Sequence, residues 1–408
     1  MAFAFVFPGQ GSQAVGMGQE LAAEFTAARA VLAEVDDALG QNLSGLMANG
    51  PIEDLTLTEN AQPALMATSL AVMRVLEAEF GISVTAAQFV AGHSLGEYSA
   101  LAAAGALTIS DAAKLLKLRG RAMQQAVPVG LGTMAALLGA DEAMAQQAVD
   151  AGSLVGVCAI ANDNAPGQIV ISGSTVAIEA AIDRATALGV KKAMMLPVSD
   201  PFHCAMMQPA ADAMAAALGS TTILPPAVPV VANVTARPTS DVEIIRRQLV
   251  EQVTARVRWR ESVLWMVEGA GITTLAEAGA GKVLTTMLKR TTKDANGVPL
   301  NVAADLGART HVLPCNLSAA EAVDALPKQA AEAMGSMDIL IANAGITRDQ
   351  LLMRMKDDDW DMVLRVNLES YFRLCRAALR GMMKARWGRI VGITSVVGVT
   401  GNPGQTNY

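Results

Sequence analysis

The chain has 408 residues, 52% of them hydrophobic and 17% charged, and its mean hydropathy is +0.35. This composition predicts two or three domains with a sizeable core and excludes global disorder. The formal net charge of −7 argues against general nucleic-acid binding, and no apolar run approaches the roughly 20 residues of a membrane span. The four cysteines are scattered, so disulfide and zinc frameworks are not expected and a reducing cytoplasm fits.

The chain opens with a strand and a glycine-containing loop. The apolar residues 3–7 predict a strand that Pro8-Gly9 ends, and the absence of a basic leader argues against a signal peptide. Gly9-Gln10-Gly11 follows, but Ala14 stands where a dinucleotide-binding loop would have its third glycine. We therefore expect this loop to line an active site.

The most informative stretch is Gly92-His93-Ser94-Leu95-Gly96. It follows the apolar residues 89–91, which predict the end of a buried strand, and precedes helix-forming residues 97–104. This pattern is typical of a nucleophile elbow, in which glycines give a sharp turn the room it needs. The serine hydroxyl then lies at a helix N-terminus, where free N–H groups stabilise an oxyanion. With 35 glycines in the chain a chance match is the alternative, and the strand–helix context argues against it.

Further elements alternate along the chain. Helices are expected at 17–38, at 61–80 (opened by Asn60 and Pro63) and at 110–125 (with Ser110 as N-cap). After a linker at 128–132, the order strand–helix–strand–strand–helix–strand predicts a ferredoxin-like subdomain at 133–138, 141–150, 155–161, 168–172, 176–188 and 191–196. The main domain resumes near Val198, with helices at 205–218, 241–253 and 260–268, strands at 229–232 and 272–276, and a last helix ending at Arg290.

A second strand–helix alternation follows a weakly patterned junction. The junction covers 291–304 and contains Asn296-Gly297 and Pro299. Beyond it, strands are expected at 310–315, 337–342 and 389–393 and helices at 319–334 and 357–386. The expected domains are an α/β-hydrolase-like core at 1–127 and 198–300, the ferredoxin-like subdomain at 128–197, and an incomplete Rossmann-type α/β unit at 303–408.

A nucleophilic serine needs a base, and the chain has three histidines. The side chain of His93 leaves the elbow in a different direction from that of its neighbour Ser94, and His311 lies in the second α/β unit. Although a lone histidine is more often structural, elimination leaves His203 as the general base and acid.

Six blocks connect the first 300 residues to a known family. Residues 7–13, 92–98, 119–123, 201–204, 249–252 and 279–284 occur in the order found in malonyl-CoA:acyl-carrier-protein transacylases of bacterial fatty acid biosynthesis, so this part of the chain resembles that family. The resemblance implies an acyltransferase fold, with Ser94 as the acylated nucleophile. It further implies that His203 is the base, oriented by the carbonyl of Gln252.

Three more roles follow from the same resemblance. The backbone N–H groups of Gln10 and Leu95 match the oxyanion donors, and Arg119 matches the arginine that binds the free carboxylate of the malonyl group. A buried carboxylate needs such a partner, and arginine offers a bidentate one. From spacing alone, Arg119 could equally be a cation on the surface of a helix.

The implied reaction is a ping-pong transfer without cofactor or metal, from malonyl-CoA through Ser94 to the phosphopantetheine thiol of acyl carrier protein. The transacylase part is expected to be a cytoplasmic monomer. Acyl carrier proteins are acidic and this chain is net negative, so docking needs a local basic patch. The candidates, each of which could be merely a solvated face, are Lys114 with Lys117 and Arg121, Arg256 with Arg258 and Arg260, and Lys289 with Arg290 and Lys293.

One residue departs from this resemblance. Asp200 precedes Pro201, where a small apolar residue is expected. A carboxylate there would raise the pKa of the His203 imidazole and weaken it as a base at neutral pH, or it would point to solvent.

The second unit carries its own set of matching blocks. Residues 316–317, 343–349, 366–368, 384–389, 394–398 and 402–408 resemble 3-oxoacyl-(acyl-carrier-protein) reductases of the short-chain dehydrogenase/reductase family. The resemblance implies a vestigial reductase site at Asn367, Ser395 and Tyr408, and a vestigial NADP site at Asn316, Asn343 and Gly345.

Two parts of that family's site are missing from this unit. No glycine-rich pyrophosphate turn lies between Arg290 and Thr310, and the sequence stops at Tyr408, before the lysine of the Tyr-x-x-x-Lys motif. We therefore expect no reductase activity unless the missing parts are supplied by another chain. The joint is consistent with an in-frame deletion between neighbouring genes, an assembly artefact or a designed chimera.

Two further interpretations of the whole chain stay open. A serine esterase or thioesterase on a similar elbow would need an acid between Ser94 and His203, and the sequence offers Asp111, Asp141, Asp150, Asp163, Asp183 and Asp200. A non-enzymatic interpretation is that exposed apolar faces of the second unit promote association.

Overall fold

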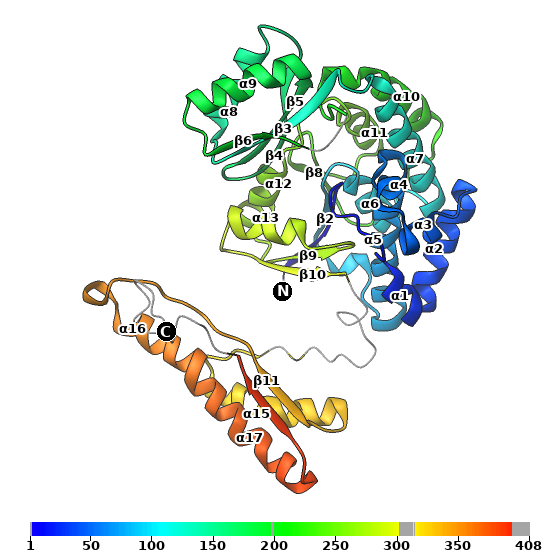
Figure 1. Ribbon diagram of the computed structural model, residues 1–408. Coiled ribbons are helices and arrows are strands. Elements are labelled where there is room, and N and C mark those ends of the chain that lie inside the picture. The colour runs from blue at the N-terminus through cyan, green and yellow to red at the C-terminus, as the bar shows by residue number, and fades with distance from the viewer. Residues whose placement is uncertain (1, 197–199, 302–312, 314, 394–408) are drawn as a thin grey trace. The chain divides into compact units, whose positions relative to one another are not determined.

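A computed structural model describes residues 2–196, 200–301, 313 and 315–393. The chain forms two compact units, Met1–Gly307 and Ala308–Tyr408 (Figure 1). Most of the strand predicted at 310–315 lies outside the described residues.

A six-stranded sheet forms the centre of the N-terminal unit. Its strands are β1 (Phe3–Phe7), β2 (Phe89–Gly92), β7 (Val230–Ala232), β8 (Arg237–Thr239), β9 (Thr274–Ala278) and β10 (Asn296–Leu300). The order is β10-β9-β1-β2-β7-β8, and all neighbours are parallel except β7 and β8. Phe7 pairs with Gly92 at the carboxyl ends of β1 and β2. The glycine-containing loop and the elbow therefore leave the sheet side by side.

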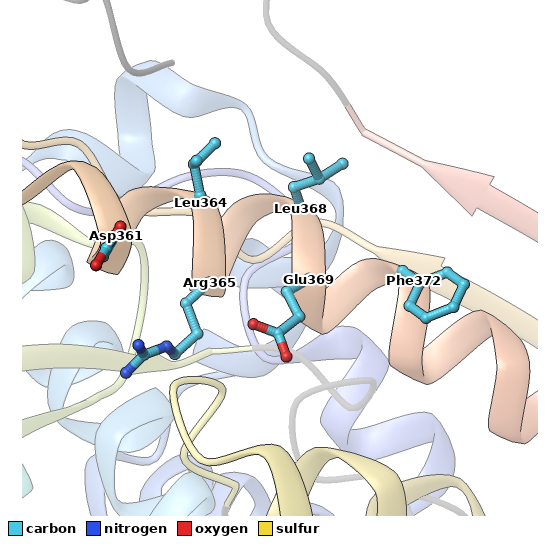
Figure 2. A pocket seen from close by; sticks show the side chains of 6 residues that line it. All are labelled: Asp361, Leu364, Arg365, Leu368, Glu369 and Phe372. Carbon is cyan, nitrogen blue, oxygen red and sulfur yellow. The ribbon is translucent and has the colours of Figure 1, made fainter.

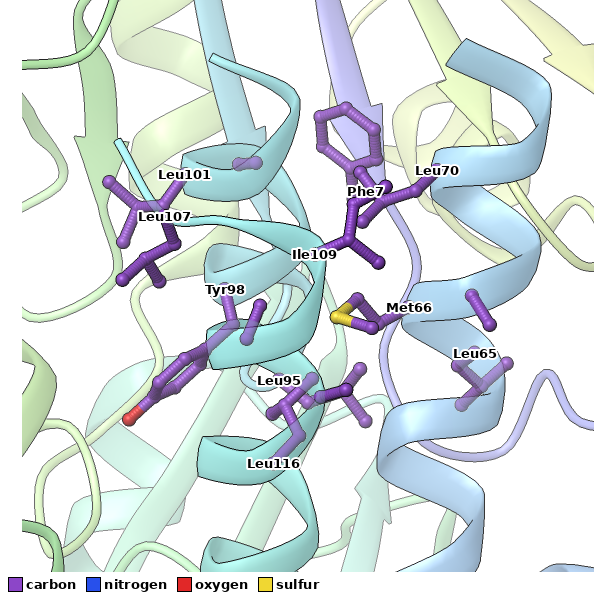
Figure 3. Close-up of a cluster of buried hydrophobic side chains, with 14 of the residues drawn as sticks. Phe7, Leu65, Met66, Leu70, Leu95, Tyr98, Leu101, Leu107, Ile109 and Leu116 are labelled. Atoms are coloured by element: carbon purple, nitrogen blue, oxygen red, sulfur yellow. The ribbon is translucent and has the colours of Figure 1, made fainter. Parts of the chain in front are cut away.

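Helices cover both faces of this sheet. They are α1 (Gln19–Glu24), α2 (Thr26–Leu39), α3 (Leu43–Asn49), α4 (Ile52–Thr56), α5 (Thr58–Phe80), α6 (Gly96–Ala103), α7 (Ile109–Ala126), α10 (Gln208–Ser220), α11 (Val242–Glu251), α12 (Trp259–Leu264) and α13 (Val283–Thr291), with short turns η1 (Val84–Ala86), η2 (Ala205–Met207) and η3 (Trp265–Gly269). Alternate residues of a strand point to opposite faces. Phe5 and Phe7 accordingly join a large core with α2, α5, α6 and α7, whereas Ala4 and Val6 join a smaller core with α12 and α13. Figure 3 shows side chains of the large core filling the space between α5, α6 and α7.

The ferredoxin-like subdomain has the predicted order of elements. These are β3 (Gly132–Leu138), α8 (Glu142–Gly152), β4 (Cys158–Ala165), β5 (Gln168–Ser174), α9 (Thr175–Ala187) and β6 (Lys192–Met195). They form an antiparallel sheet of order β4-β5-β3-β6. Its inner residues pack against α8 and α9.

The structure corrects two predicted helices near the N-terminus. The helix expected at 17–38 is interrupted at Phe25, whose backbone is extended (φ −116°, ψ 124°) and whose ring is buried. The helix expected at 61–80 begins at Thr58, and Pro63 lies inside it. Helices α3 and α4 were not predicted, because they are too short to show a helical period.

Two local signals were misinterpreted. The N-cap of α7 is Thr108 rather than Ser110, because Asp111 N donates a 3.0 Å hydrogen bond to Thr108 Oγ1. The predicted junction at 291–304 contains β10, which extends the sheet in parallel with β9. Asn296-Gly297 and Pro299 favour a turn and were therefore assigned to a junction. Proline and glycine are, however, tolerated in an edge strand such as β10.

The C-terminal unit is a small α/β structure. It contains α15 (Ala320–Met334), β11 (Ile339–Ala342), the turn η4 (Leu352–Arg354), α16 (Asp357–Leu364), the π-helical turn η5 (Arg365–Glu369), α17 (Ser370–Ala385) and β12 (Arg389–Gly392). The parallel pair β11–β12 packs on α15 and α17 through Leu340, Val323 and Leu374. This matches the predicted order of a partial Rossmann unit. A shallow hollow of about 460 Å³ lies along α16, η5 and α17. In Figure 2, Leu364 and Leu368 project from one side of this helical stretch and Arg365 and Glu369 from the other.

Within the described ranges, no helix is both long enough and apolar enough to cross a membrane.

Candidate active site

Ser94 lies in a sharp turn between β2 and α6. Its φ is +53°, in the left-handed region that residues with a Cβ rarely adopt. The turn needs glycine at both flanks, since a Cβ on Gly92 would collide with the backbone of Gly96, and a Cβ on Gly96 would collide with Phe7 O. The turn thereby presents the Ser94 hydroxyl at the N-terminus of α6.

His203 pairs with this serine. Ser94 Oγ lies 2.9 Å from His203 Nε2, and His203 Nδ1 lies 2.8 Å from the carbonyl oxygen of Gln252. A carbonyl only accepts hydrogen bonds, so Nδ1 carries the proton and Nε2 is free to accept from the hydroxyl. No described acidic side chain contacts Nδ1, which argues against the triad that the esterase interpretation requires.

The environment of His203 keeps its imidazole neutral. Burial, and after it the positive charge of Arg119, lower the pKa of His203 to about 3. Only 4% of the side chain is exposed. The unprotonated Nε2 is the form that a general base needs.

Arg119 lies beside the pair, and only 1% of it is exposed. Its Nη2 donates to Ser94 Oγ at 3.2 Å and to Gln252 Oε1 at 3.0 Å, while Nη1 donates to Gln62 Oε1 at 2.9 Å. Its Nε has no partner among the described residues. Burial lowers the pKa of Arg119, but an arginine keeps its charge. The alternative of a surface cation is therefore wrong, and the guanidinium can accept an anion next to the serine.

Two amide side chains hold the backbone of the elbow. Asn233 Nδ2 donates to Gly92 O and Asn233 Oδ1 accepts from Ser94 N, both at 2.7 Å. Gln252 Nε2 donates to Ser94 O at 3.0 Å. Both residues also contact one carboxylate oxygen, Glu97 Oε2, which accepts from Gln252 Nε2 at 2.8 Å and from Asn233 N at 3.0 Å. These bonds satisfy buried peptide groups of a strained turn.

The loop after β1 lies against the elbow. His93 N donates to Phe7 O at 3.0 Å, and a Cβ on Gly9 would come within 2.8 Å of His93 O. Among the described hydrogen bonds, the backbone N–H groups of Gln10 and Leu95 have no acceptor. Both are therefore available to an anion beside Ser94.

His93 is engaged elsewhere, as its position in the elbow predicts. Its Nε2 lies 2.8 Å from Asn164 Oδ1 of β4, and its ring packs edge-on against Trp259 with the ring centroids 5.7 Å apart. Burial lowers the pKa of His93. The contact joins the elbow to the ferredoxin-like subdomain.

Asp200 points neither to solvent nor to His203, so both expectations for it are wrong. It is 8% exposed, and its Oδ2 accepts a 3.4 Å hydrogen bond from Thr58 Oγ1. Burial raises the pKa of Asp200. The pKa of His203 is lowered rather than raised.

In one of the three candidate basic patches, that of Arg256, Arg258 and Arg260, arginines form ion pairs within the N-terminal unit. Arg256 Nη2 and Arg260 Nη2 lie 2.8 and 2.7 Å from Asp163 Oδ2, and both arginines also pair with Glu142 of α8. Their charges are largely neutralised, and the pairs tie the core to the subdomain. These three arginines are therefore poor candidates for a basic patch that binds acyl carrier protein.

The other two candidate basic patches, around Lys114 and around Lys289, have fewer of their charges neutralised by ion pairs. Lys117 and Arg121 share Glu59, at 3.0 and 3.3 Å. Lys114, Lys289 and Lys293 form no ion pair with any described residue.

In the C-terminal unit, Asn367 contacts the segment that follows β11. Asn367 Oδ1 accepts from Ile346 N at 2.8 Å, and Nδ2 donates to Ile346 O at 2.9 Å. Asn343 and Asn367 both line a second hollow, between α15, β11 and α17. Gly345 is also close, since a Cβ on it would lie 3.5 Å from Asn367 Oδ1. Asn316 instead accepts a 3.0 Å bond from Ser318 N in a local turn. Ser395 and Tyr408 lie outside the described residues, so their roles and the NADP site stay predictions.

Sequence reasoning missed the residues that support the site. Asn233, Glu97 and Gln62 each contact a candidate residue rather than offering a reactive group, and Asn164 contacts His93, the neighbour of Ser94. These residues could have been found as polar residues at positions that the periodicity of the strands and helices assigns to the core. No group of described histidine, cysteine, aspartate or glutamate side chains could hold a metal ion.

Comparison with protein families gives two matches. The family model of the acyl transferase domain matches residues 4–322. The family model of the short chain dehydrogenases matches residues 268–408.

Named relatives match the N-terminal unit. The malonyl CoA-acyl carrier protein transacylase of Salmonella typhimurium is 44% identical over 306 residues, which cover 75% of this chain and 98% of that protein. The crystal structure of the acyl-carrier-protein S-malonyltransferase from Bartonella henselae is 52% identical, with a TM-score of 0.73 and coverage of 76% of this chain and 98% of that one. A malonyl-transacylase solved in complex with a type II PKS acyl-carrier protein is 42% identical, with a TM-score of 0.72 and coverage of 75% and 98%.

Proposed function

The chain belongs to the acyl transferase family, and from this premise we propose that it transfers the malonyl group from malonyl-CoA to the phosphopantetheine thiol of acyl carrier protein in fatty acid biosynthesis. The observation that carries the proposal is a buried guanidinium, Arg119, 3.2 Å from the hydroxyl of a serine that is paired with His203. A malonyl thioester supplies the carboxylate that such a guanidinium binds. Relatives that bear the name of this activity support the same substrate, and one of them binds an acyl-carrier protein.

The first half-reaction acylates the enzyme. Ser94 Oγ attacks the thioester carbonyl carbon while His203 Nε2 takes the hydroxyl proton. The N–H groups of Gln10 and Leu95 bind the oxyanion that forms. The C–S bond then breaks, and the sulfur of CoA leaves as a thiol with the proton from His203 Nε2.

The second half-reaction reverses these roles with a different thiol. The phosphopantetheine sulfur gives its proton to His203 Nε2 and attacks the malonyl ester carbonyl. The ester C–O bond breaks, and Ser94 Oγ recovers the proton from the imidazolium. The Gln252 carbonyl holds Nδ1–H throughout, which keeps Nε2 aimed at the serine.

The malonyl carboxylate also makes the imidazole of His203 a stronger base. The charge of Arg119 is, after burial, a cause of the low pKa of His203. A carboxylate bound to Arg119 cancels that charge and raises the pKa of the imidazole, while burial still holds this pKa well below its ordinary value. An acetyl group leaves the charge in place, so selection for malonyl acts on both binding and proton transfer.

The transacylase reaction needs no cofactor. Further parts of the proposal are that the N-terminal unit acts as a monomer in the cytoplasm, that Lys114, Lys289 and Lys293 contribute to the docking of acyl carrier protein, and that exposed apolar residues of the C-terminal unit promote association.

Intact-protein mass spectrometry after incubation with malonyl-CoA tests the proposal. We expect one malonyl adduct on the wild type, none on Ser94→Ala, and an adduct on Ser99→Ala, which changes a buried serine of α6 with no hydrogen-bond partner among the described residues. Addition of acyl carrier protein that carries phosphopantetheine should move the malonyl mass to that protein. An adduct that persists in Ser94→Ala, or one that is lost to water as fast as to the carrier protein, contradicts the proposal.

A further inference from the structure

Glu97 is a buried carboxyl group that the proposed steps do not use. It lies in the first turn of α6, three residues after Ser94, and is only 2% exposed. Its Oε2 accepts hydrogen bonds from Gln252 Nε2 at 2.8 Å and from Asn233 N at 3.0 Å. Gln252 and Asn233 are the two residues whose side-chain amides bond to the backbone of Ser94. Glu97 therefore fixes the positions of the side chains that hold the nucleophile.

The side-chain amide of Gln252 links Glu97 to Arg119. Its Nε2 donates to Glu97 Oε2, and its Oε1 accepts from Arg119 Nη2 at 3.0 Å. An anion and a cation are thus joined through a single amide inside a buried site. Electrostatic attraction over such a distance is strong where water is excluded.

We propose that Glu97 is a positioning residue that couples the binding of the malonyl carboxylate to the uptake of one proton. The ionised Glu97 and the substrate carboxylate compete for the positive charge of Arg119. When the malonyl group binds, Glu97 takes a proton from solvent, and the network then holds one carboxylate and one guanidinium. The inference rests on the proposed role of Arg119 as the partner of the malonyl group.

The other groups near Glu97 keep one charge state around neutral pH. Arg119 of α7 stays protonated, and burial raises the pKa of the neighbouring Tyr98 away from neutrality. Burial lowers the pKa of His203, across the Ser94 hydroxyl, to about 3. Burial raises the pKa of Glu97 to about 7, against the opposing effects of its two hydrogen bonds and of Arg119. Glu97 is therefore the member of this network that changes charge near neutrality.

The rate of Ser94 acylation by malonyl-N-acetylcysteamine, a thioester without the phosphates of CoA, tests the coupling. In the wild type we expect KM to rise about tenfold between about pH 6 and about pH 9 with little change in kcat, because the ionised Glu97 weakens the hold of Arg119 on the substrate. Glu97→Gln keeps an oxygen for both donors but cannot ionise. Its KM should stay near the low-pH value of the wild type throughout.

A matched control changes a second buried carboxyl. Glu277 is fully buried, and its oxygens accept from Leu284 N and Thr285 N of α13, outside the Ser94 network. Glu277→Gln should keep the wild-type rise in KM. If Glu97→Gln also keeps that rise, the inference is overturned.

A second measurement does not depend on the folding of Glu97→Gln. Calorimetric titration of Ser94→Ala with malonyl-CoA, in buffers of different ionisation enthalpy near pH 7.5, should show net proton uptake that is absent with acetyl-CoA. Equal proton exchange for both ligands overturns the coupling. The absence of any malonyl adduct on the wild type overturns the proposed function and this inference with it, whereas a normal adduct without proton uptake overturns this inference alone.

Discussion

Both units of this chain contain polar residues that were predicted to belong to a site, but the two units hold these residues in different ways. In the N-terminal unit, Ser94, His203, Arg119 and Gln252 come from separate segments and are joined by hydrogen bonds of 2.8 to 3.2 Å. In the C-terminal unit, Asn367 bonds to the backbone of a nearby segment, and the outer face of the two-stranded sheet is open, with Ile339 53% and Ile341 62% exposed. The comparison indicates that a residue of the right type forms part of a site only when buried neighbours fix the direction and the pKa of its side chain.

The largest expected effect separates the units by activity. His203→Ala should slow malonylation of Ser94 by about 10³-fold, because the proton acceptor is lost. Asn367→Ala, which removes the best-supported polar contact of the C-terminal candidate site, should leave the rate unchanged. Rapid-quench mass spectrometry measures both. A comparable loss in the two variants would mean that the units do not act independently.

Glycine substitutions test the same contrast through stability. Gly92→Ala places a Cβ against the backbone of Gly96, so we expect it to lower the free energy of unfolding by about 3 kcal/mol or more. Gly381→Ala lies in α17, where a Cβ meets nothing within 4 Å, and should raise it by up to about 1 kcal/mol. Urea unfolding followed by circular dichroism gives both values. A stable, active Gly92→Ala would show that the elbow is not as tight as described.

The buried carboxyl of Glu97 should make stability depend on pH. Burial raises its pKa from 4.5 to about 7, so the folded state binds the proton more tightly than the unfolded state does. The stabilisation that this proton gives to the folded state is complete below about pH 4.5. It is lost as the pH rises through 7, which lowers the free energy of unfolding by up to about 3 kcal/mol. Glu97→Gln should remove this slope, so the difference in unfolding free energy between wild type and variant should change across that window. A difference that does not vary with pH would place the carboxyl in a more hydrated environment.

The smallest expected signal is the reductase activity of the C-terminal unit. We expect the purified chain not to oxidise NADPH above background with a β-ketoacyl substrate. Absorbance of NADPH at increasing protein concentration is the measurement. Turnover that scales with protein, and that Ser94→Ala keeps, would show that this unit has a complete site.

Patterns in the sequence were sufficient for the elbow and for the order of elements in the ferredoxin-like subdomain. The apolar residues before Gly92, the two glycines and the helix formers after Gly96 together predicted a turn that the structure shows at Ser94, with φ +53°. Elimination among three histidines selected His203, which the structure places 2.9 Å from the hydroxyl. Arg119 needed the family resemblance, because its burial depends on packing between α5, α6 and α7 that spacing does not reveal.

The residues that sequence reasoning missed depend on long-range contacts. Asn233 reaches the elbow from a position more than a hundred residues away, so no local pattern connects it to Ser94. Gln252 is similarly distant, and it was predicted only through the family resemblance. The edge strand β10 was hidden by Asn296-Gly297 and Pro299, which favour a turn in isolation. Only its pairing with β9 makes that segment a strand.

The measurement that tests the central claim most directly compares malonyl and acetyl transfer in Arg119→Ala. Arg119 is buried beside Ser94, so its loss should slow acylation by malonyl-CoA by about 10²-fold or more and leave acylation by acetyl-CoA equal or faster. Arg119→Lys should recover part of the malonyl rate, because it keeps the charge without the bidentate fork. If Arg119→Ala slows both acyl groups equally, the guanidinium supports the fold of the site and does not select the malonyl carboxylate.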